Sequence, residues 1–507
     1  MDTEPSAGVA DGAPQSVHDL VLSGGRVIDP ETGLDAVRHI AVDDGRIVAI
    51  AEEPLRARRV VDVTGRVVAP GFIDLHSHAL TPTSMRLQAL DGVTTALELE
   101  AGAPWLEGAY RDAALDGRPI NYGYSASWAA ARMSVMDDLD PRTLTTQLTA
   151  RMGGRSWGAP GTPDDVRRIL DRLESELELG ALGIGVLIGY APDASHREYL
   201  DVARLAARYG VPTYTHARHK NSSEPGTALQ GIQEVVAVGL GTGAHMHLCH
   251  INSTSLQQID VVTELVGNAR AHGVQVTTEA YPYGASMTAI GAPFLHPDNL
   301  PRLGITPSHI VHTPTGERPA TASRLMQLRA QDPGAPAIIQ YLDESRADEQ
   351  NLLRRALLFD DTMIASDAMP LQSGDGKPLT GTEWPPPADA VTHPRSTGTF
   401  ARTLRVYVRE TGLLTLPEVI RRATLLPARV LERACPDARR KGRVQPGADA
   451  DLVVFDPLTV HDRSTYEHPT RPSDGFQHVL VGGEFVVRDG EIDLDAMPGR
   501  PLRGARG

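Results

Sequence analysis

The sequence predicts an α/β protein, a (β/α)8 TIM-like barrel with a small β-sandwich domain formed by both ends of the chain. Between about residues 67 and 439, apolar strand-like runs alternate with amphipathic helix-like runs, a pattern typical of parallel strands covered by helices. Short apolar runs joined by glycine and aspartate turns precede this region, and a similar set follows it. The two sets are therefore expected to form one small domain beside the barrel.

The ends of the chain divide into a leader, a split β-domain and a tail. Residues 1–17 are rich in Ala, Gly, Pro and acidic residues and are expected to form a disordered leader. Residues 18–66 and 440–490 are assigned to the small β-domain, and residues 491–507 to a C-terminal tail. The strand-like runs that support this division are 20–22, 26–29, 39–42, 46–50, 60–63, 450–456 and 478–487.

The middle region, residues 67–439, contains eight strand candidates. They are residues 68–74, 94–100, 120–125, 182–188, 211–215, 244–248, 274–279 and 362–366. Eight such strands suit a closed barrel, although pattern alone leaves open a doubly wound sheet with a cap domain. The stretch from about 285 to 360 is too long for one helix and is expected to be an insertion over the barrel mouth.

Composition excludes several classes of function. The chain of 507 residues has 49 basic and 64 acidic residues, a net charge of −15, which disfavours nucleic acid or an anionic membrane surface as a partner. No apolar run reaches the length of a membrane-spanning helix. Two cysteines cannot form a disulfide framework and residues 1–16 lack export features, so the cytoplasm is the expected compartment. Assembly into a homo-oligomer stays open.

Two histidines close the first barrel strand. His76 and His78 are two residues apart, so on a strand both imidazoles point to the same face, at the C-terminal end where barrel enzymes build their sites. Other polar residues end or follow the later strands: Glu98, Glu100, His216, His250 and Asp367. Imidazoles and carboxylates gathered at one barrel mouth suit Zn²⁺ or a similar divalent ion, with room for two ions.

Several ordered motifs resemble one family, the metal-dependent amidohydrolases, and within it the N-acyl-D-amino-acid deacylases (D-aminoacylases). The resemblance covers nearly the whole chain, and that family folds as a (β/α)8 barrel with a small β-domain built from both termini. The motifs are PGFIDLHSH at 70–78, GVTT at 92–95, THAR at 215–218, HLCH at 247–250, YPY at 281–283, SD at 366–367, HPR at 393–395, GTF at 398–400, TLLPA at 424–428, GRV at 442–444 and ADLVVF at 450–455.

The resemblance implies a role for each matching residue. The metal ligands would be His76, His78, His216 and His250, and Asp367 would contact the metal-bound water and carry its proton to the departing amine. The metal would lower the pKa of that water so that it attacks the amide carbonyl. The substrate would be a small molecule with a free carboxylate, and the residues implied to hold that carboxylate are Tyr190, Tyr283 and Arg395.

The sequence departs from the family pattern at two places. Where the family usually has a lysine two residues after the last histidine ligand, this chain has Asn252. Where D-aminoacylases have a metal-binding cysteine on the second strand, an ungapped match places Ala101. We expect Glu100 to replace the thiolate, which would relax a preference for zinc toward Mn²⁺ or Co²⁺. Glu98 is the next candidate, and ion pairing of both glutamates with basic residues is the alternative.

Other polar and aromatic residues are expected to have structural roles. Three histidines near the ligands should support them or fill the core: His219, His245 and His247. Cys249 is expected to be a small buried side chain, and Trp105 and Trp128 to serve in packing. Glu174, Glu176 and Glu178 form an acidic run that is expected to be a solvated helix face.

The leading hypothesis is a metal-dependent hydrolase of N-acyl amino acids, with the D-configuration favoured by the resemblance alone. One alternative is a cyclic-amide hydrolase of the hydantoinase or dihydroorotase type, which typically uses a carboxylated lysine from strand four; residues 181–190 contain no lysine. A second alternative is a catalytically inactive scaffold, which would be expected to have lost ligands, whereas the four histidines and Asp367 are present.

Overall fold

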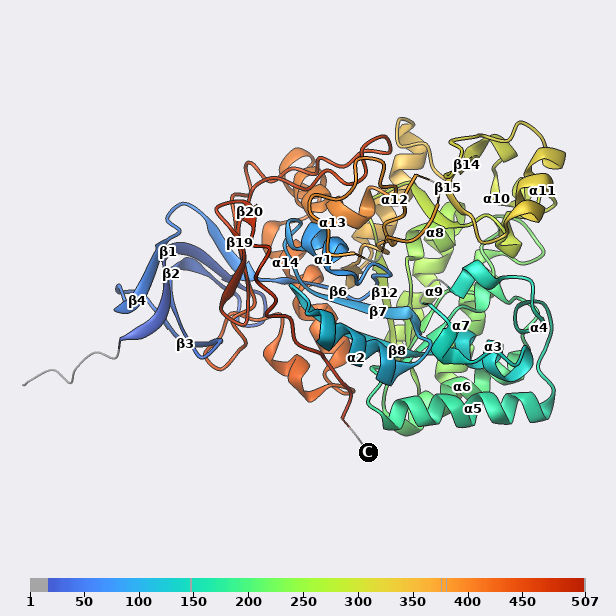
Figure 1. Cartoon of the computed structure of the whole chain (residues 1–507), viewed down its shortest axis with the longest axis horizontal. Coiled ribbons are helices and arrows are strands. Elements are labelled where there is room, and N and C mark those ends of the chain that lie inside the picture. Colours follow the sequence, from blue (N-terminus) through green and yellow to red (C-terminus); the bar gives the residue numbers. More distant parts are fainter. Residues whose placement is uncertain (1–16, 146–147, 375, 380, 506–507) are drawn as a thin grey trace, which may run out of the picture.

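The computed structural model describes residues 17–505 except 146, 147, 375 and 380. The leader predicted for residues 1–17 therefore lies outside the described part of the chain, apart from its last residue. Figure 1 shows two regions along the long axis: a β-rich region that contains strands from both ends of the chain, and a larger region of strands surrounded by helices. In the described residues, no helix is both long and apolar enough to cross a membrane.

Eight parallel strands form the barrel, as the sequence predicts. The sheet order is β16-β12-β11-β10-β9-β8-β7-β6, so neighbours in the sheet follow the order of the chain. A parallel bridge between Ser77 and Ala368, and a hydrogen bond from the His78 N–H to the Ala368 carbonyl at 2.8 Å, join the two outermost strands. The strands are β6 (Phe72–Asp74), β7 (Val93–Ala103), β8 (Asn121–Ser127), β9 (Ile184–Val186), β10 (Pro212–Thr215), β11 (His245–Leu248), β12 (Val276–Ala280) and β16 (Thr362–Ile364).

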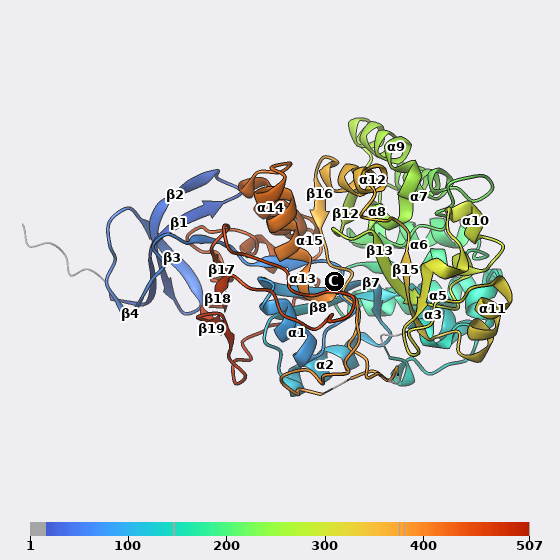
Figure 2. The same cartoon turned by 90° about the horizontal axis from the view of Figure 1, so that it is seen from above.

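Helices between the strands cover the outside of the barrel (Figure 2). The longest, α5 (Pro163–Glu178), begins with a capping box in which Thr162 accepts from the Asp165 N–H, and with proline at its first position. Its buried face carries Ile169, Leu173 and Leu177. The other covering helices are α1 (Pro82–Ala89), α2 (Leu106–Asp116), α3 (Trp128–Met136), α6 (His196–Tyr209), α7 (Ala228–Thr242), α9 (Ile259–Ala271), α12 (Ala347–Leu358) and α14 (Leu416–Ala423).

One expectation about α5 is wrong. Glu176 does not lie on a solvated face: its side chain is buried and accepts a hydrogen bond from the Leu106 N–H at 3.0 Å. The first turn of α2 has unpaired backbone donors, and a carboxylate at a helix N-terminus satisfies one of them. Glu174 is half-buried and Glu178 is exposed, so only part of the acidic run is solvated.

The small β-domain is one mixed sheet built from both ends of the chain. Its order is β20-β19-β18-β17-β5-β1-β2-β3, with β4 paired to β1. The N-terminal and C-terminal halves meet where β5 pairs antiparallel with β17, and β5 leads directly into the first barrel strand. The strands are β1 (His18–Asp29), β2 (Leu34–Asp43), β3 (Arg46–Ala51), β4 (Ala57–Asp62), β5 (Val67–Pro70), β17 (Leu452–Phe455), β18 (Phe476–Val481), β19 (Glu484–Arg488) and β20 (Glu491–Ile492).

A three-stranded antiparallel sheet lies in the region where the sequence predicts an insertion. Its order is β13-β15-β14, with bounds Ala285–Ala289, Pro336–Gln340 and Ile310–His312, and it is accompanied by α10 (Leu300–Leu303) and α11 (Ala322–Gln331). Met287 and Thr288 of β13 line the cavity above the barrel strands. The insertion therefore covers part of the barrel mouth.

The last residues of the chain return to the barrel and pack against strand and helix ends. The Leu502 N–H donates to the Tyr122 carbonyl at 2.7 Å, and the Gly504 N–H to the Gly180 carbonyl at 2.8 Å. The Tyr110 hydroxyl donates to the Leu502 carbonyl at 2.5 Å. Tyr122 lies at the start of β8, so this segment contacts the barrel at the end opposite the strand C-termini.

Candidate metal centre

The polar residues predicted at the strand ends meet in a buried group below a small cavity. The cavity has a volume of about 70 Å³, and its walls include His78, Glu100, Tyr190, His250 and Asp367. These residues follow or end five different elements of the barrel, and all lie on the side where the parallel strands finish. Convergence of strand ends, which the sequence pattern predicts, accounts for the grouping.

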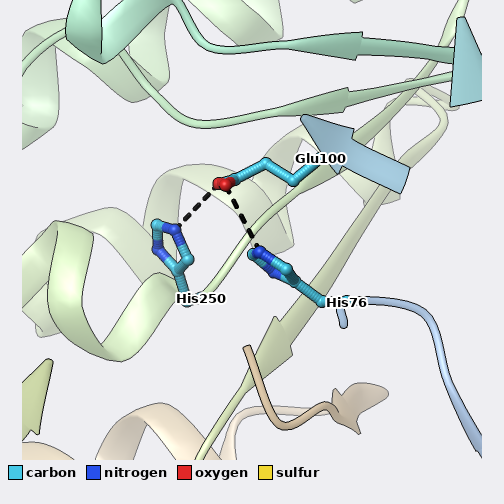
Figure 3. Close-up of side chains that lie close together, drawn as sticks. All are labelled: His76, Glu100 and His250. Carbon is cyan, nitrogen blue, oxygen red and sulfur yellow. Dashed lines mark hydrogen bonds and ion pairs between the residues drawn. The ribbon is translucent and has the colours of Figure 1, made fainter. Parts of the chain in front are cut away.

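Glu100 lies at the centre of the group. Its Oε1 is 2.9 Å from the Nε2 of His250, and its Oε2 is 3.3 Å from the Nε2 of His76 (Figure 3). The Nε2 of His78 lies 3.6 Å from the same carboxylate. Asp367 completes the group, with its Oδ1 3.4 Å from His76 and 3.6 Å from His78.

This donor set fits a divalent cation. The Nε2 atoms of His76 and His78 face each other at 3.2 Å, and two neutral ring nitrogens that both present lone pairs need a shared cation or proton between them. Ligand atoms of His76, Glu100 and His250, and separately of His76, His78 and Asp367, lie within 4.8 Å of one another. Imidazole and carboxylate ligands at this spacing suit zinc, manganese or cobalt.

Two buried carboxylates orient the histidines. Glu98 contacts the Nδ1 of His78 at 2.8 Å, and Glu279 contacts the Nδ1 of His76 at 2.5 Å. A carboxylate at Nδ1 holds the proton there and leaves Nε2 free to bind a metal. Glu98 therefore has a supporting position, and Glu100 is the strand-two carboxylate that contacts the Nε2 atoms of His76 and His250. Both glutamates are paired with histidines rather than with basic residues.

Sequence reasoning missed Glu279. It ends the predicted seventh strand, so the rule that identified Glu100 applies to it equally. Its second oxygen lies 2.9 Å from the Nε2 of His247, which places that histidine in support of the site, as expected. Burial would raise the pKa of Glu279, but His76 and His247 hold it well below its usual range. Burial lowers the pKa of His76, and the charges of Glu100, Asp367 and Glu279 outweigh it and raise that pKa.

His216 lies beside the group, but its side chain bonds to the Ala217 carbonyl and not to a member of the group. Its ring centroid is 4.9 Å from that of His250, and its ring stacks on Phe294 at 5.8 Å. Burial lowers the pKa of His216 to about 3, so the ring is neutral at physiological pH. A neutral imidazole is the form that binds a metal ion.

Asp367 is held by Arg395. The Nη2 of Arg395 lies 2.8 Å from the Oδ2 of Asp367, and its Nε donates to the Asp367 carbonyl at 2.7 Å. Asp367 has a φ of +50°, a left-handed conformation in which non-glycine residues are uncommon. The guanidinium fixes this backbone and leaves one carboxylate oxygen facing His76 and His78.

The three residues implied to bind substrate do not all lie together. Tyr190 packs edge-on against His216 at 4.8 Å and shares a hydrogen bond with the Thr288 hydroxyl at 2.7 Å. Arg395 is fully buried, and its Nη1 has no hydrogen-bond partner in the described residues. Tyr283 points elsewhere: its ring contacts His393 and Arg402.

Tyr281, rather than Tyr283, lies against Arg395. The guanidinium carbon of Arg395 lies 4.6 Å above the Tyr281 ring, and that ring is 6.3 Å from His250. The two tyrosines are separated by one proline, and the sequence alone gave no signal to choose between them.

The remaining residues singled out from the sequence lie outside the group. His245 contacts the Thr277 hydroxyl at 2.9 Å, and Trp128 is buried and donates to Glu198 at 2.9 Å. Trp105 packs against Gly108, at the start of α2, where an added Cβ would meet the indole at 2.2 Å. Cys249 is the exception: it is buried, and its sulfur lies within 4.8 Å of ligand atoms of His76 and Glu279. His219 lines an outer groove.

Comparisons with known proteins agree with this geometry. The model of the amidohydrolase family matches residues 59–487. The N-acyl-D-glutamate deacylase of Alcaligenes xylosoxydans xylosoxydans is 30% identical over 96% of this chain and 97% of that protein.

Two solved structures have the same fold. The N-acyl-D-glutamate deacylase of Bordetella bronchiseptica, solved with zinc and a phosphonate that mimics the tetrahedral intermediate, has a TM-score of 0.76 and 28% identity, covering 96% of this chain and 100% of that one. A D-aminoacylase with a binuclear metal centre has a TM-score of 0.76 and 26% identity at the same coverage.

Proposed function

Because the chain belongs to the amidohydrolase family, we propose that it is a metal-dependent hydrolase that cleaves the amide bond of N-acyl amino acids, with N-acyl-D-amino acids as the substrate class. The observation that carries the proposal is the convergence of His76, Glu100 and His250 with Asp367, whose other oxygen is fixed by Arg395. Three relatives that are 26–30% identical to this chain and are named as deacylases of D-amino acids or as D-aminoacylase support the choice of substrate class.

The proposed metal ligands are His76, His78, Glu100, His216 and His250. The ion is Zn²⁺, or Mn²⁺ or Co²⁺ because one proposed ligand is a carboxylate. When bound there, it supplies an acidified water and polarises the amide carbonyl. Glu98 and Glu279 keep the protons of His78 and His76 on Nδ1. The Nε2 lone pairs of both histidines are therefore free to bind the ion.

Asp367 is the proposed proton carrier. Its Oδ1 faces the histidine pair while its Oδ2 is held by Arg395, so only one oxygen is available to accept and return a proton. An amide cannot be cleaved at neutral pH unless its departing nitrogen receives a proton. Asp367 delivers that proton, and the ion pair with Arg395 keeps the carboxylate in one orientation during the transfer.

The substrate carboxylate is proposed to bind near Arg395 and Tyr190. The Nη1 of Arg395 is a buried donor without a partner in the described residues, which an incoming anionic acceptor would satisfy. Tyr190 lines the same cavity beside His216. Tyr281, in contact with the Arg395 guanidinium, takes the position first expected for Tyr283.

The two alternatives are less well supported. A hydantoinase-type centre needs a lysine from the fourth strand, and β9 together with the turn that follows it contains none. An inactive scaffold gives no reason to keep four buried ionisable side chains and the partly buried His78 in contact, because burying charged groups is costly.

Acetate release from N-acetyl-D- and N-acetyl-L-amino acids by zinc-loaded protein tests the function. We expect hydrolysis of D-substrates, and we expect Asp367→Asn to retain its metal while losing several orders of magnitude in kcat. Hydrolysis of cyclic amides in preference to N-acyl amino acids, or near-native turnover by Asp367→Asn with bound metal, would overturn the proposal.

A further inference from the structure

Lys220 is a buried basic residue whose nitrogen contacts two aromatic rings and, in the described part of the chain, no carboxylate. Its side chain is 4% exposed, and its Nζ donates one hydrogen bond, to the Tyr341 hydroxyl at 3.1 Å. The same Nζ lies 4.3 Å from the Phe294 ring centroid and 4.5 Å from that of Tyr341. Among the described residues, no carboxylate forms an ion pair with it. Buried ammonium groups are normally paired with an anion, so an anionic ligand would stabilise Lys220 in this position.

The lysine is separated from the metal centre by one aromatic ring. Phe294 stacks on His216 at 5.8 Å and packs edge-on against Tyr190 at 5.4 Å. Burial lowers the pKa of Lys220 to about 7, although the negative charges of Asp367 and Glu100 act in the opposite direction. Lys220 is therefore within electrostatic range of the proposed reaction site but is not one of its ligands.

Asn252 is uncharged, and its side chain bonds to the backbone of residues 281 and 283. It is buried, its Oδ1 accepts from the Tyr281 N–H at 3.3 Å, and its Nδ2 donates to the Tyr283 carbonyl at 3.5 Å. The side chain is used to hold the loop that follows β12. A positive charge expected two residues after His250 is thus absent, while an unexpected one is present four residues after His216.

We propose that Lys220 recognises a carboxylate of the substrate, replacing the charge that is missing at Asn252. This inference rests on the proposed function and specifies its substrate class as anionic N-acyl amino acids. The ammonium, flanked by Phe294 and Tyr341, would bind the carboxylate as a point charge from the side of β10, while the free Nη1 of Arg395 binds from the side of β16. The carboxylate can be the α-carboxylate or that of an acidic side chain.

The test compares three ligands and three variants. The ligands are N-acetyl-D-glutamate, N-acetyl-D-alanine and N-acetyl-D-alaninamide, which carry two, one and no carboxylates. The variants are Lys220→Met, which keeps the length of the side chain, Lys220→Arg, which keeps the charge, and the control Arg302→Met. Arg302 lines the same outer groove as Lys220 and Phe294, but its guanidinium bonds to Asn299.

The measurements are KM, Kd by calorimetry and bound zinc. We expect Lys220→Met to raise KM and Kd for the carboxylates about tenfold or more, with Lys220→Arg less affected and the neutral amide and Arg302→Met unchanged. An effect on both acids assigns the α-carboxylate, and an effect on the glutamate alone assigns the side chain. Zinc content should stay constant in all variants.

Three results would overturn the role of Lys220. Lys220→Met could change KM and Kd equally for charged and neutral ligands, it could leave both constants unchanged, or the native protein could fail to bind either of the two acids. A different result would count against the proposed function alone. In that case the protein would bind the acids in a manner that depends on Lys220, but it would release no acetate from any of the ligands.

Discussion

Arg395 holds Asp367 at two points, through an ion pair of 2.8 Å to its side chain and a hydrogen bond of 2.7 Å to its carbonyl. The arginine expected to bind substrate therefore also positions the proposed proton carrier. Two of its side-chain nitrogens, Nη2 and Nε, contact Asp367, and the third, Nη1, has no hydrogen-bond partner among the residues that the structure describes. A side chain with fewer donors cannot make all of these contacts.

We expect Arg395→Lys to lower kcat about a hundredfold or more in addition to raising KM, because a point charge cannot hold both the carboxylate and the carbonyl of Asp367. If Arg395 bound only substrate, the variant would change kcat and KM differently for ligands with and without a carboxylate. Steady-state kinetics on an N-acyl amino acid and its amide separate the two roles. Unchanged kcat for the amide would contradict a positioning role.

Glu279 is expected to control metal affinity from beneath the site. Glu279→Gln keeps the shape of the side chain but removes its charge and one of its two acceptor oxygens, so it can no longer accept from both His76 and His247. We expect roughly tenfold to hundredfold weaker zinc binding, measured by competition with a chelator. Thr277→Val is the control, because Thr277 lies on the same strand as Glu279 and also contacts His247. Equal losses in both variants would assign the effect to the packing of β12.

Glu31 joins the two halves of the small β-domain. Its Oε2 accepts from the Nε of Arg443 at 2.7 Å, a contact between the N-terminal strands and the segment that follows the barrel. Hydrogen bonds from Arg443 lower the pKa of Glu31 to about 2, below its usual 4.5. A carboxyl group whose pKa is lowered by folding stabilises the protein above about pH 4.5, and this contribution disappears as the pH falls toward 2.

Glu31→Gln should therefore lower the free energy of unfolding at pH 7 by about 1–2 kcal/mol, after allowance for the partial exposure of the pair. The difference from the native chain should shrink between pH 5 and pH 3. Denaturant unfolding at several pH values checks this. Glu52→Gln removes an ion pair whose carboxylate is largely exposed, and should leave stability unchanged. A pH-independent difference for Glu31→Gln would contradict the assigned cause.

The sequence was sufficient for the barrel because strand ends carry their own signal. His76, His78, Glu100, His250 and Asp367 were all predicted from their positions after apolar runs, and the structure brings them together. The same rule covers Glu279, but nothing in the sequence indicates which side chain it meets. That partner is His76, which lies 203 residues away along the chain.

Other contacts depend on side-chain direction, which pattern does not determine. Tyr281 and Tyr283 have the same residue type and lie two positions apart, yet one faces Arg395 and the other Arg402. Glu176 belongs to an acidic run that suits a solvated face, but the start of α2 lies against it and supplies a backbone donor. Such partners come from distant segments, and only the packed structure shows which side chain meets them.

The last prediction separates the two glutamates of β7. Glu100 touches His250 and His76 through Nε2 atoms, the positions that face the other ligands, whereas Glu98 touches the Nδ1 of His78 and the Ala101 N–H at 3.3 Å. Glu100→Ala removes a proposed ligand and should reduce zinc content to a fraction of the native value.

Glu98→Ala should retain most of its zinc but bind it more weakly. The substitution removes no proposed ligand, but it removes the carboxylate that keeps the proton of His78 on Nδ1. Atomic absorption after dialysis at a fixed free-zinc level measures both variants side by side. A thiolate is a softer ligand than a carboxylate, so Glu100→Cys should shift the preferred ion from manganese or cobalt toward zinc. Full zinc content in Glu100→Ala, together with a loss in Glu98→Ala, would reverse the two assignments. The metal would then lie nearer the His78 side of the group.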